Sequence, residues 1–397
     1  MTTVNEEPSR LPLATSTWDD DEYRAIDRVV ASGNFTMGAE VRAFEEEFAS
    51  WLGVPHAIMV NSGSSANLLA VATAVLNPEI DLAPGDEVLV PAVSWATTYS
   101  PLHQYGLRLV FVDIDPDTLN IDLDAAGRAI GKRTKAIASV NLLGNPVDAV
   151  ALKSLADSHN LLVIEDNCES LGATVAGVAA GTMGRFGTFS SFFSHHISTM
   201  EGGVVSAFDD RDAATLRSLR AHGWTRDISP TSPLRPPPTD EFEELFRFVL
   251  PGYNLRPTEM SGAIGRAQLS KVPSIIDGRR RNAREFVRLM SDVDGVRVQR
   301  ETGESSWFGF AMTLEGPLRG RRSDIVAALR ASGIEARPVV AGNFTRNPVM
   351  RFFDARISGP LDAADAVHDN GFFVGNHHYD VGPGLAKVAE IVSAHSA

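Results

Sequence analysis

The chain has 397 residues, of which 44% are hydrophobic and 22% charged, a composition typical of a globular protein with a large core. Its formal net charge of −14 argues against a nucleic-acid-binding protein, because such proteins need a basic surface. The single cysteine, Cys168, excludes an intramolecular disulfide and any zinc or iron–sulfur site held by four cysteines. Neither a signal-peptide pattern nor an apolar run of about 18 residues is present, so we expect a cytoplasmic protein without a membrane span.

Two helices are expected first, over residues 19–32, capped by Ser16 or Thr17, and over residues 40–52. Strands and helices then alternate, which predicts a mainly parallel sheet with helices on both faces. The expected strands are 56–60, 87–93, 107–114, 135–143 and 161–166, and the expected intervening helices include 64–76 and 150–159.

The pattern changes after Asp227, where a segment rich in Pro, Ser and Thr predicts a long loop. A helical region is expected near residues 258–292, with breaks, followed by a smaller α+β domain from about residue 296. We therefore divide the chain into an N-terminal arm and helix (1–38), a large domain (39–270), and a connecting helix with a small C-terminal domain (271–397).

Three clusters carry candidate chemistry. The first is the strand-to-helix turn over residues 61–67, which contains Gly63 and Ser64. Backbone N–H groups at the start of a helix can bind a phosphate group, although an ordinary serine-capped turn explains the same residues equally well.

The second cluster is the end of the strand 161–166, where Asp166 is placed to hold a protonated ring nitrogen or simply to cap the next segment. The third is a loop with Ser190, the pair His195 and His196, and the turn Gly202-Gly203. Metal binding is the commonest function of paired histidines, but no carboxylate stands at a ligand spacing, so we expect no metal.

In their order and spacing these clusters resemble the pyridoxal-phosphate (PLP) enzymes of the aspartate aminotransferase-like fold, in particular the nucleotide-sugar aminotransferases. Further segments that resemble the group are 32–38, 91–97, 144–146 and 252–256, so the resemblance covers nearly the whole chain. It implies PLP fold type I, with a mainly parallel seven-stranded sheet between helices in the large α/β domain and a smaller C-terminal α+β domain.

The resemblance also implies a set of cofactor contacts. Gly63, Ser64 and Ser190 would bind the cofactor phosphate. Trp95 would stack on the pyridine ring, and Asp166 would pair with the ring N–H group, which keeps the ring an electron sink.

Two more contacts follow from the same resemblance. Glu169 would lie beside the ring. Asn254 would reach the phosphate from a neighbouring subunit, so the resemblance implies a homodimer.

The chain departs from the aminotransferase pattern at one decisive position. Enzymes of this group carry a lysine seven residues before the Gly-Gly turn, and that lysine binds the cofactor covalently. Seven residues before Gly202 stands His195, and no lysine lies between residues 154 and 270. Histidine cannot form an imine but transfers protons well near neutral pH. An ordinary aminotransferase is therefore not expected.

This variation resembles the 3-dehydratase branch of the family, which removes the C3 hydroxyl group of nucleotide-linked 4-keto-6-deoxyhexoses. One kind uses an iron–sulfur cluster, which a single cysteine cannot hold. The other acts on GDP-4-keto-6-deoxymannose and is favoured here. Eight residues in segments that resemble this branch are expected near the sugar nucleotide: Thr36, Met37, His222, Trp224, Asn343, Arg346, Asn376 and His377.

The resemblance implies that glutamate converts PLP to pyridoxamine phosphate (PMP), leaving 2-oxoglutarate. His195 would then take a proton from the cofactor and return it to the departing hydroxyl group, and ammonia would be released. Three alternatives stay open: a related PLP enzyme with another substrate, an inactive homologue that only binds the cofactor, and a hydrolase with a His-His metal site.

Overall fold

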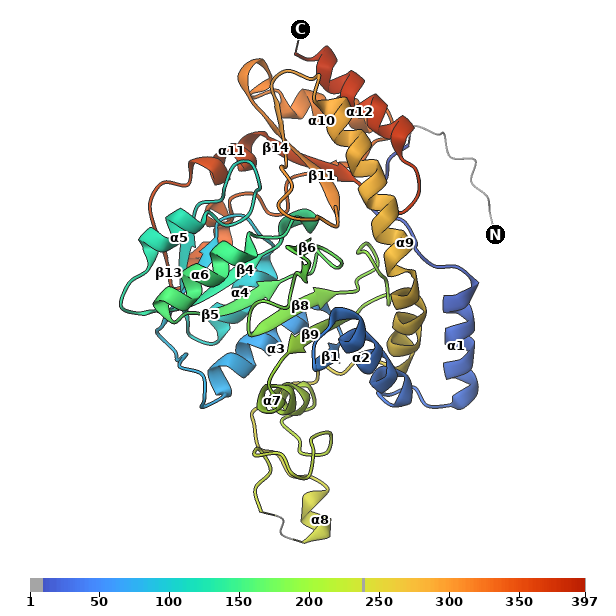
Figure 1. Cartoon of the computed structure of the whole chain (residues 1–397), viewed down its shortest axis with the longest axis vertical. Coiled ribbons are helices and arrows are strands. Elements are labelled where there is room, and N and C mark those ends of the chain that lie inside the picture. Colours follow the sequence, from blue (N-terminus) through green and yellow to red (C-terminus); the bar gives the residue numbers. More distant parts are fainter. Residues whose placement is uncertain (1–9, 238–239, 397) are drawn as a thin grey trace.

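The computed structural model describes residues 10–237 and 240–396. Its large domain is built on an eight-stranded sheet (Figure 1). Across the sheet the order is β1 (His56–Val60), β9 (Gly203–Ala207), β8 (Phe186–Ser190), β5 (Leu162–Asp166), β4 (Thr134–Val140), β2 (Glu87–Pro91), β3 (Arg108–Val112) and β13 (Ala355–Ile357).

The sheet is mainly parallel, as expected, with β9 as the single strand that runs against its neighbours β1 and β8. Seven strands were expected and eight are present. The additional strand, β13, pairs with β3 and comes from residues 355–357, in the part of the chain that the sequence assigned to the small domain.

Helices cover both faces of the sheet because its strands are apolar on both sides. Successive residues of β2 show this: Val88 and Val90 pack on one face, and Leu89 packs on the other. The first face is covered by α3 (Gly63–Leu76), α4 (Ala96–Gln104) and α7 (Asp210–Arg220), and the second by α5 (Leu123–Ala129) and α6 (Ala149–His159).

The small domain is a four-stranded antiparallel sheet covered by helices. Its strands lie in the order β10 (Val296–Val298), β11 (Gly309–Leu314), β14 (Gly371–Gly375) and β12 (Ala336–Arg337). The helices are α10 (Arg322–Ala331), α11 (Asp362–Asn370) and α12 (Gly382–Ala394).

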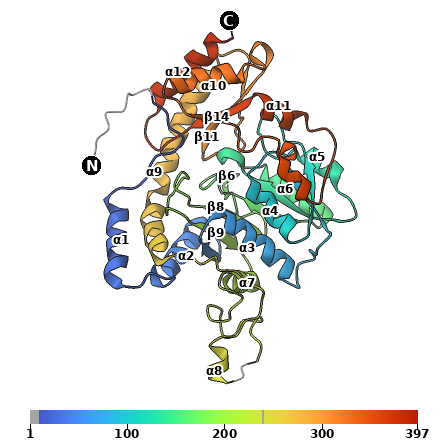
Figure 2. The same ribbon diagram turned by 180° about the vertical axis from the view of Figure 1, so that it is seen from behind.

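One long helix, α9 (Glu259–Met290), connects the two domains (Figures 1 and 2). It is continuous, although Pro273 lies inside it, so the breaks expected from the sequence are absent. Its first half packs against α2 (Ala39–Leu52), and its second half joins the core of the small domain.

The helix α1 (Asp20–Ser32) also packs on α9. The expected cap at Ser16 or Thr17 is wrong, because Asp19 is the N-cap residue and forms a capping box with Glu22. An ion pair between Lys271 of α9 and Glu22 of α1, at 2.8 Å, fixes α1 to α9.

A long arm leaves the body after α7 and carries the short helix α8 (Glu241–Glu244) at its far end (Figures 1 and 2). Large apolar side chains on this arm are exposed: Phe242, Leu245, Phe246 and Phe248. In the described part of the chain, no helix is long and apolar enough to cross a membrane.

Candidate active site

A cavity of about 650 Å³ lies between the large sheet and the small domain. Its large-domain wall includes the ends of β1, β2, β4, β5 and β8 and the segments that follow them, so it lies at the carboxyl ends of parallel strands, where open α/β sheets bind ligands. The facing wall is formed by the small-domain residues Phe308, Arg337, Pro338, Val340 and Phe373.

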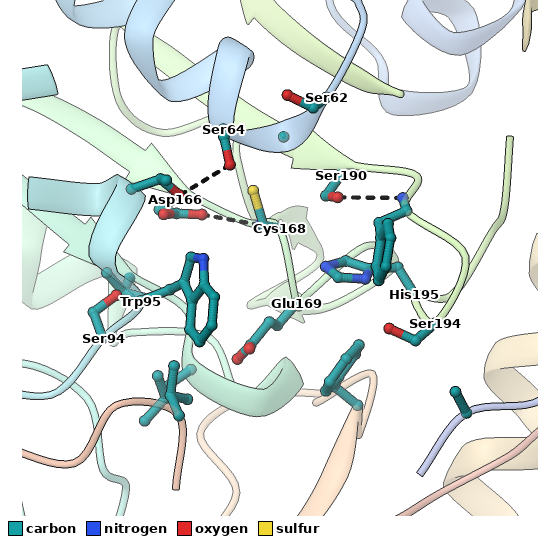
Figure 3. A pocket seen from close by; sticks show the side chains of 18 of the residues that line it. Ser62, Ser64, Ser94, Trp95, Asp166, Cys168, Glu169, Ser190, Ser194 and His195 are labelled. Atoms are coloured by element: carbon teal, nitrogen blue, oxygen red, sulfur yellow. Dashed lines mark hydrogen bonds between the residues drawn. The ribbon is translucent and has the colours of Figure 1, made fainter. Parts of the chain in front are cut away.

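The end of β1 leads directly into the first turn of α3. Ser62 caps this helix, accepting a hydrogen bond from the N–H group of Ser65 at 3.1 Å. A Cβ atom at Gly63 would lie only 2.5 Å from Cβ of Ser190, so nothing larger than glycine fits there without displacing the Ser190 segment. The serines at 62, 64 and 190 and the free helix N–H groups thus surround one end of the cavity (Figure 3).

Asp166, at the end of β5, is buried and held from three sides. Its Oδ2 accepts hydrogen bonds from Nδ2 of Asn67 at 2.8 Å and Oγ1 of Thr98 at 2.7 Å, and its Oδ1 accepts one from the N–H group of Cys168 at 3.1 Å. A carboxylate has about four acceptor sites, so one remains for a donor in the cavity.

Trp95 precedes α4 and is 58% exposed, although it is among the largest apolar side chains of the domain. In Figure 3 its indole ring, the carboxyl group of Glu169 and the ring of His195 border the same open space. An accessible indole face offers a stacking surface for a flat aromatic ligand.

Glu169 carries one of the carboxyl groups that line this space. Its Oε2 accepts a hydrogen bond from the N–H group of Leu143 at 2.8 Å. Desolvation by burial, with a smaller effect of the Asp166 charge, raises the pKa of Glu169 to about 7.

The two neighbouring histidines have different surroundings. His195 lines the cavity, and its ring contacts Phe308 edge-on with 5.1 Å between centroids. Its Nδ1 is buried without a partner, which leaves Nε2 as the nitrogen open to the cavity. Desolvation, and secondly the charge of Arg279, lowers the pKa of His195 to about 4, so the ring is neutral at pH 7.

His196 lies outside the cavity and is 1% exposed. Its Nε2 bonds to the carbonyl oxygen of Ser306 at 3.1 Å, which ties the loop to the segment before β11. Of the two histidines, therefore, only His195 can contact a ligand in the cavity. Among the described residues, no group of three His, Cys, Asp or Glu side chains is arranged to hold a metal ion.

All five lysines lie outside the cavity: Lys132, Lys135, Lys153, Lys271 and Lys387. Four of them form ion pairs with carboxylates: Lys135 pairs with Asp81, and Lys153, Lys271 and Lys387 have partners at 3.0 Å or less. A lysine that binds an aldehyde cofactor is therefore missing from the position that His195 occupies.

The expected cofactor contacts within one chain come together in this cavity, which is lined by Gly63, Ser64, Trp95, Asp166, Glu169, Ser190 and His195. They fit pyridoxal phosphate: a helix start and serines at one end, an indole face in the middle, and a fixed carboxylate with a free acceptor site.

Nine other expected residues do not line the cavity: Asn254, Thr36, Met37, His222, Trp224, Asn343, Arg346, Asn376 and His377. Asn376 is buried and bonds to backbone carbonyl groups of Arg279 and Trp307. Arg346 pairs with Asp369 at 2.9 Å beside a separate groove.

His222, Trp224 and Asn254 lie together where the arm joins the body. The backbone there is paired, since Asn254 bridges to Ala221 and Trp224 bridges to Phe248. These side chains therefore lie at the base of the arm and outside the cavity of their own chain.

Several residues that line the cavity were not anticipated from the sequence. They include Leu13 and Ala14 before α1, Phe192, Phe193 and Glu201 near His195, and the small-domain residues Phe308, Arg337 and Phe373. Phe192 and Phe193 lie in the same loop as His195 and His196, which the sequence marks as a candidate site. The small-domain residues belong to no recognisable sequence motif.

Residues 16–390 match the DegT/DnrJ/EryC1/StrS aminotransferase family. A relative from Yersinia pseudotuberculosis, a GDP-4-keto-6-deoxy-D-mannose 3-dehydratase, is 50% identical over 383 residues, which are 96% of this chain and 98% of the relative. The solved structure of a GDP-4-keto-6-deoxymannose-3-dehydratase with a trapped PLP-glutamate geminal diamine has a TM-score of 0.94 at 47% identity and covers 96% of this chain and 100% of its own. The Escherichia coli enzyme with bound hydrated PLP has a TM-score of 0.94 at 48% identity, with 96% and 99% covered.

Proposed function

The chain belongs to the DegT/DnrJ/EryC1/StrS aminotransferase family, and from this membership and the cavity we propose that it removes the C3 hydroxyl group of GDP-4-keto-6-deoxymannose, with PLP as cofactor. Glutamate supplies the amino group and becomes 2-oxoglutarate, and each turnover releases ammonia and a 3-deoxy-4-ketosugar. The observation that carries the proposal is His195 at the position of the family's lysine, inside a cavity that fits the cofactor.

When bound, the cofactor supplies an electron sink that allows a proton and then a neighbouring hydroxyl group to leave. The chain holds it without a covalent bond, through the start of α3 and Ser190 at the phosphate, and Trp95 at the ring face. Asp166 accepts a hydrogen bond from the ring nitrogen, since its three protein donors leave one acceptor site free.

His195 moves the protons in this proposal. Its low pKa keeps the imidazole neutral at pH 7, so Nε2 is available to take a proton. Once charged, the ring is disfavoured by its burial and, secondly, by the charge of Arg279, which favours release of the proton to the departing hydroxyl oxygen.

An inactive cofactor-binding homologue is the alternative. Such a protein has no need for a neutral histidine facing the cavity, or for a Glu169 carboxyl group whose pKa burial raises to about 7. His195 also argues against a sugar aminotransferase, because it stands at the position of the family's lysine and no other lysine lines the cavity.

We also propose that the enzyme works as a homodimer. Asn254, His222 and Trp224 lie at the base of the arm and outside their own cavity. The exposed Phe242, at 81%, and Phe246, at 70%, on the same arm fit burial against a second copy. Sedimentation of the active enzyme tests this, and a fully active monomer contradicts it.

A panel of nucleotide-linked 4-ketosugars, incubated with the protein, PLP and glutamate, tests the function. We expect the 3-deoxy-4-ketosugar and ammonia from the GDP-linked sugar, read by mass spectrometry. A 4-aminosugar as the main product, or no reaction with any GDP-linked ketosugar, contradicts the proposal.

A further inference from the structure

Two consecutive arginines of α9 bind the segment 304–308, which precedes β11, and they differ in how their charge is balanced. Arg280 donates hydrogen bonds to the carbonyl oxygens of Ser305 at 2.9 Å and Glu304 at 3.2 Å, and the Glu304 carboxylate lies 3.6 Å from it. Arg279 is 4% exposed and has no carboxylate within ion-pair distance among residues 10–237 and 240–396. Burial lowers the pKa of Arg279 only to about 10, so it is charged at neutral pH. A buried charge without a counter-ion is costly, which indicates a role of its own.

The guanidinium of Arg279 holds a strained turn in this segment. Its Nη1 atom donates hydrogen bonds to the carbonyl oxygens of Phe308 at 3.0 Å and Trp307 at 3.4 Å. Trp307 has a φ of 48°, a left-handed conformation that a bulky residue keeps only where its surroundings fix it. Nδ2 of Asn376 donates a further bond to the Trp307 carbonyl oxygen at 2.8 Å, and the N–H group of Phe308 bonds to the carbonyl oxygen of Leu143 at 2.9 Å. Arg279 is therefore one of the groups that keep the turn in place.

The turn carries the aromatic surface that His195 contacts. The ring of Phe308 meets the His195 ring edge-on, with 5.1 Å between centroids, and both residues line the cavity. His196 packs on the same phenyl ring at 5.8 Å and bonds to the carbonyl oxygen of Ser306. A change in this turn therefore moves the support of the His195 imidazole, and a displacement of about 1 Å in a catalytic group can lower a rate by about 10²-fold.

The charges around His195 come from both domains. The titratable and charged groups that line the cavity with it are Asp166, Cys168, Glu169, Glu201 and Arg337, and His196 and Arg279 lie near it outside the cavity lining. Burial, and after it the charge of Arg279, lowers the pKa of His195 to about 4. The same charge lowers the pKa of His196, His377 and His378 as well, so imidazoles rather than carboxylates surround Arg279. With no counter-ion to cancel it, the charge acts on the His195 ring.

We propose that Arg279 is a positioning residue for His195: it fixes the Phe308 ring against the imidazole by holding the turn, and its buried charge keeps the imidazole uncharged. This rests on the proposed function, in which His195 moves protons. A base that starts neutral and is poorly stabilised once charged both accepts a proton and gives it up again, as transfer from carbon to a departing hydroxyl group requires.

Three variants of the full-length protein test the proposal. Arg279→Gln removes the charge, and Arg279→Lys keeps the charge but not the fork of donors. Arg280→Gln is the matched control, because it removes the neighbouring arginine from the same segment, where Glu304 already balances its charge. Circular dichroism and thermal unfolding show which variants are folded.

The first measurement is the titration of His195, followed by NMR of labelled histidine rings and identified by the signal that is lost in His195→Asn. We expect Arg279→Gln to move this titration to higher pH by at least about 0.5 pH unit, because the protonated ring no longer faces a positive charge. Arg279→Lys and Arg280→Gln should titrate like the parent protein, since each keeps a charge at position 279.

The second measurement is the glutamate half-reaction of the PLP-loaded protein, followed by cofactor absorbance. We expect Arg279→Gln to lower kcat at pH 7 at least about tenfold, with a much smaller change in KM, because the base is displaced while the substrate contacts remain. Arg279→Lys should recover part of this loss, and Arg280→Gln should react normally.

An unchanged titration or an unchanged kcat in folded Arg279→Gln overturns the proposal. It is also overturned if Arg280→Gln reproduces both effects, because the integrity of the whole segment would then explain them. If Arg279→Gln does not fold, Arg279→Lys decides: a reduced kcat with a parent-like titration supports the proposal, and a full kcat overturns it.

These measurements contain no ketosugar, so they are independent of the dehydration assay. If the panel of sugars gives no dehydration while Arg279→Gln shifts the titration and lowers kcat, the proposed function fails and the role of Arg279 stands. If dehydration is found and Arg279→Gln behaves like the parent protein, the proposed function stands and the role of Arg279 fails.

Discussion

The two walls of the cavity are built in different ways. On the large-domain wall, each functional segment directly follows a strand: the turn at Gly63 after β1, Asp166 at the end of β5, and Ser190 with His195 from the end of β8. The small-domain wall takes Phe308 from before β11, Arg337 from β12 and Phe373 from the middle of β14.

This difference suggests that one wall holds the cofactor and the other contacts the substrates. Parallel strands bring their carboxyl ends to one edge, so the large-domain wall is a compact place to hold a cofactor. The small-domain wall approaches from another part of the fold, on the far end of α9. Changes on the first wall should therefore affect the cofactor, and changes on the second should affect substrates only.

The largest effect on the cofactor wall is expected at Asp166. Asp166→Asn removes the negative charge while keeping the size of the side chain, so we expect the glutamate half-reaction to slow by about 10²–10³-fold. Cofactor absorbance follows the rate. Asp157→Asn, at an exposed acid paired with Lys153 on α6, is the control and should react normally.

The next effect is steric. Gly63→Ala places a Cβ atom 2.5 Å from Cβ of Ser190 and 2.9 Å from Sγ of Cys168. Displacing these atoms should cost about 1–3 kcal/mol, felt as weaker PLP binding in an equilibrium titration. Gly127→Ala in α5 meets its nearest atom at 3.6 Å and should change nothing, and equal affinities in the two variants contradict this account.

A pH dependence distinguishes Glu169. The folded protein holds its proton up to about pH 7, whereas the unfolded chain releases it near the ordinary pKa of 4.5. The contribution of this group to the free energy of unfolding therefore falls as pH rises between these values. Glutamine does not ionise, so the Glu169→Gln variant does not lose this contribution. Its free energy of unfolding, relative to that of the parent protein, should therefore rise by on the order of 1–3 kcal/mol from pH 5 to pH 8. Urea unfolding at both pH values measures it, and a constant difference argues against a protonated Glu169.

The smallest effect compares one aromatic residue from each wall. Trp95→Ala should weaken PLP binding by about 0.5–1.5 kcal/mol, the value of an aromatic pair. Phe373→Ala, on the small-domain wall, should leave PLP affinity unchanged and weaken only substrate binding. An equal loss of PLP affinity in both variants would contradict the claim that only the large-domain wall binds the cofactor.

The same division explains what the sequence allowed us to predict. The predicted βα alternation and the fold class are confirmed, because strands buried on both faces are continuous apolar runs. The residues expected at the cofactor stood in motifs next to those strands, and Gly63, Asp166 and His195 do lie together in the cavity. Their individual roles stay predictions.

Other features depend on contacts that no local pattern encodes. Strand β13 has three residues and pairs with β3 from more than 200 positions away in the sequence. The cap of α1 is Asp19 rather than Ser16 or Thr17, because Glu22 completes a capping box with Asp19. Arg337 and Phe373 reach the cavity only through strand pairing in the small domain. The expected role of Asn254 at the phosphate of a neighbouring subunit stays a prediction.

The central claim is that His195, rather than a lysine or His196, moves protons at this site. Dehydration rates of His195→Asn and His196→Asn, with PLP affinity and stability measured for each, test it most directly. We predict that His195→Asn keeps most of its PLP affinity and loses at least about 10²–10⁴-fold in rate. His196→Asn should lose much less activity, since His196 bonds to Ser306 outside the cavity. Near-normal dehydration by His195→Asn, or a greater loss in His196→Asn with its fold intact, would contradict the account.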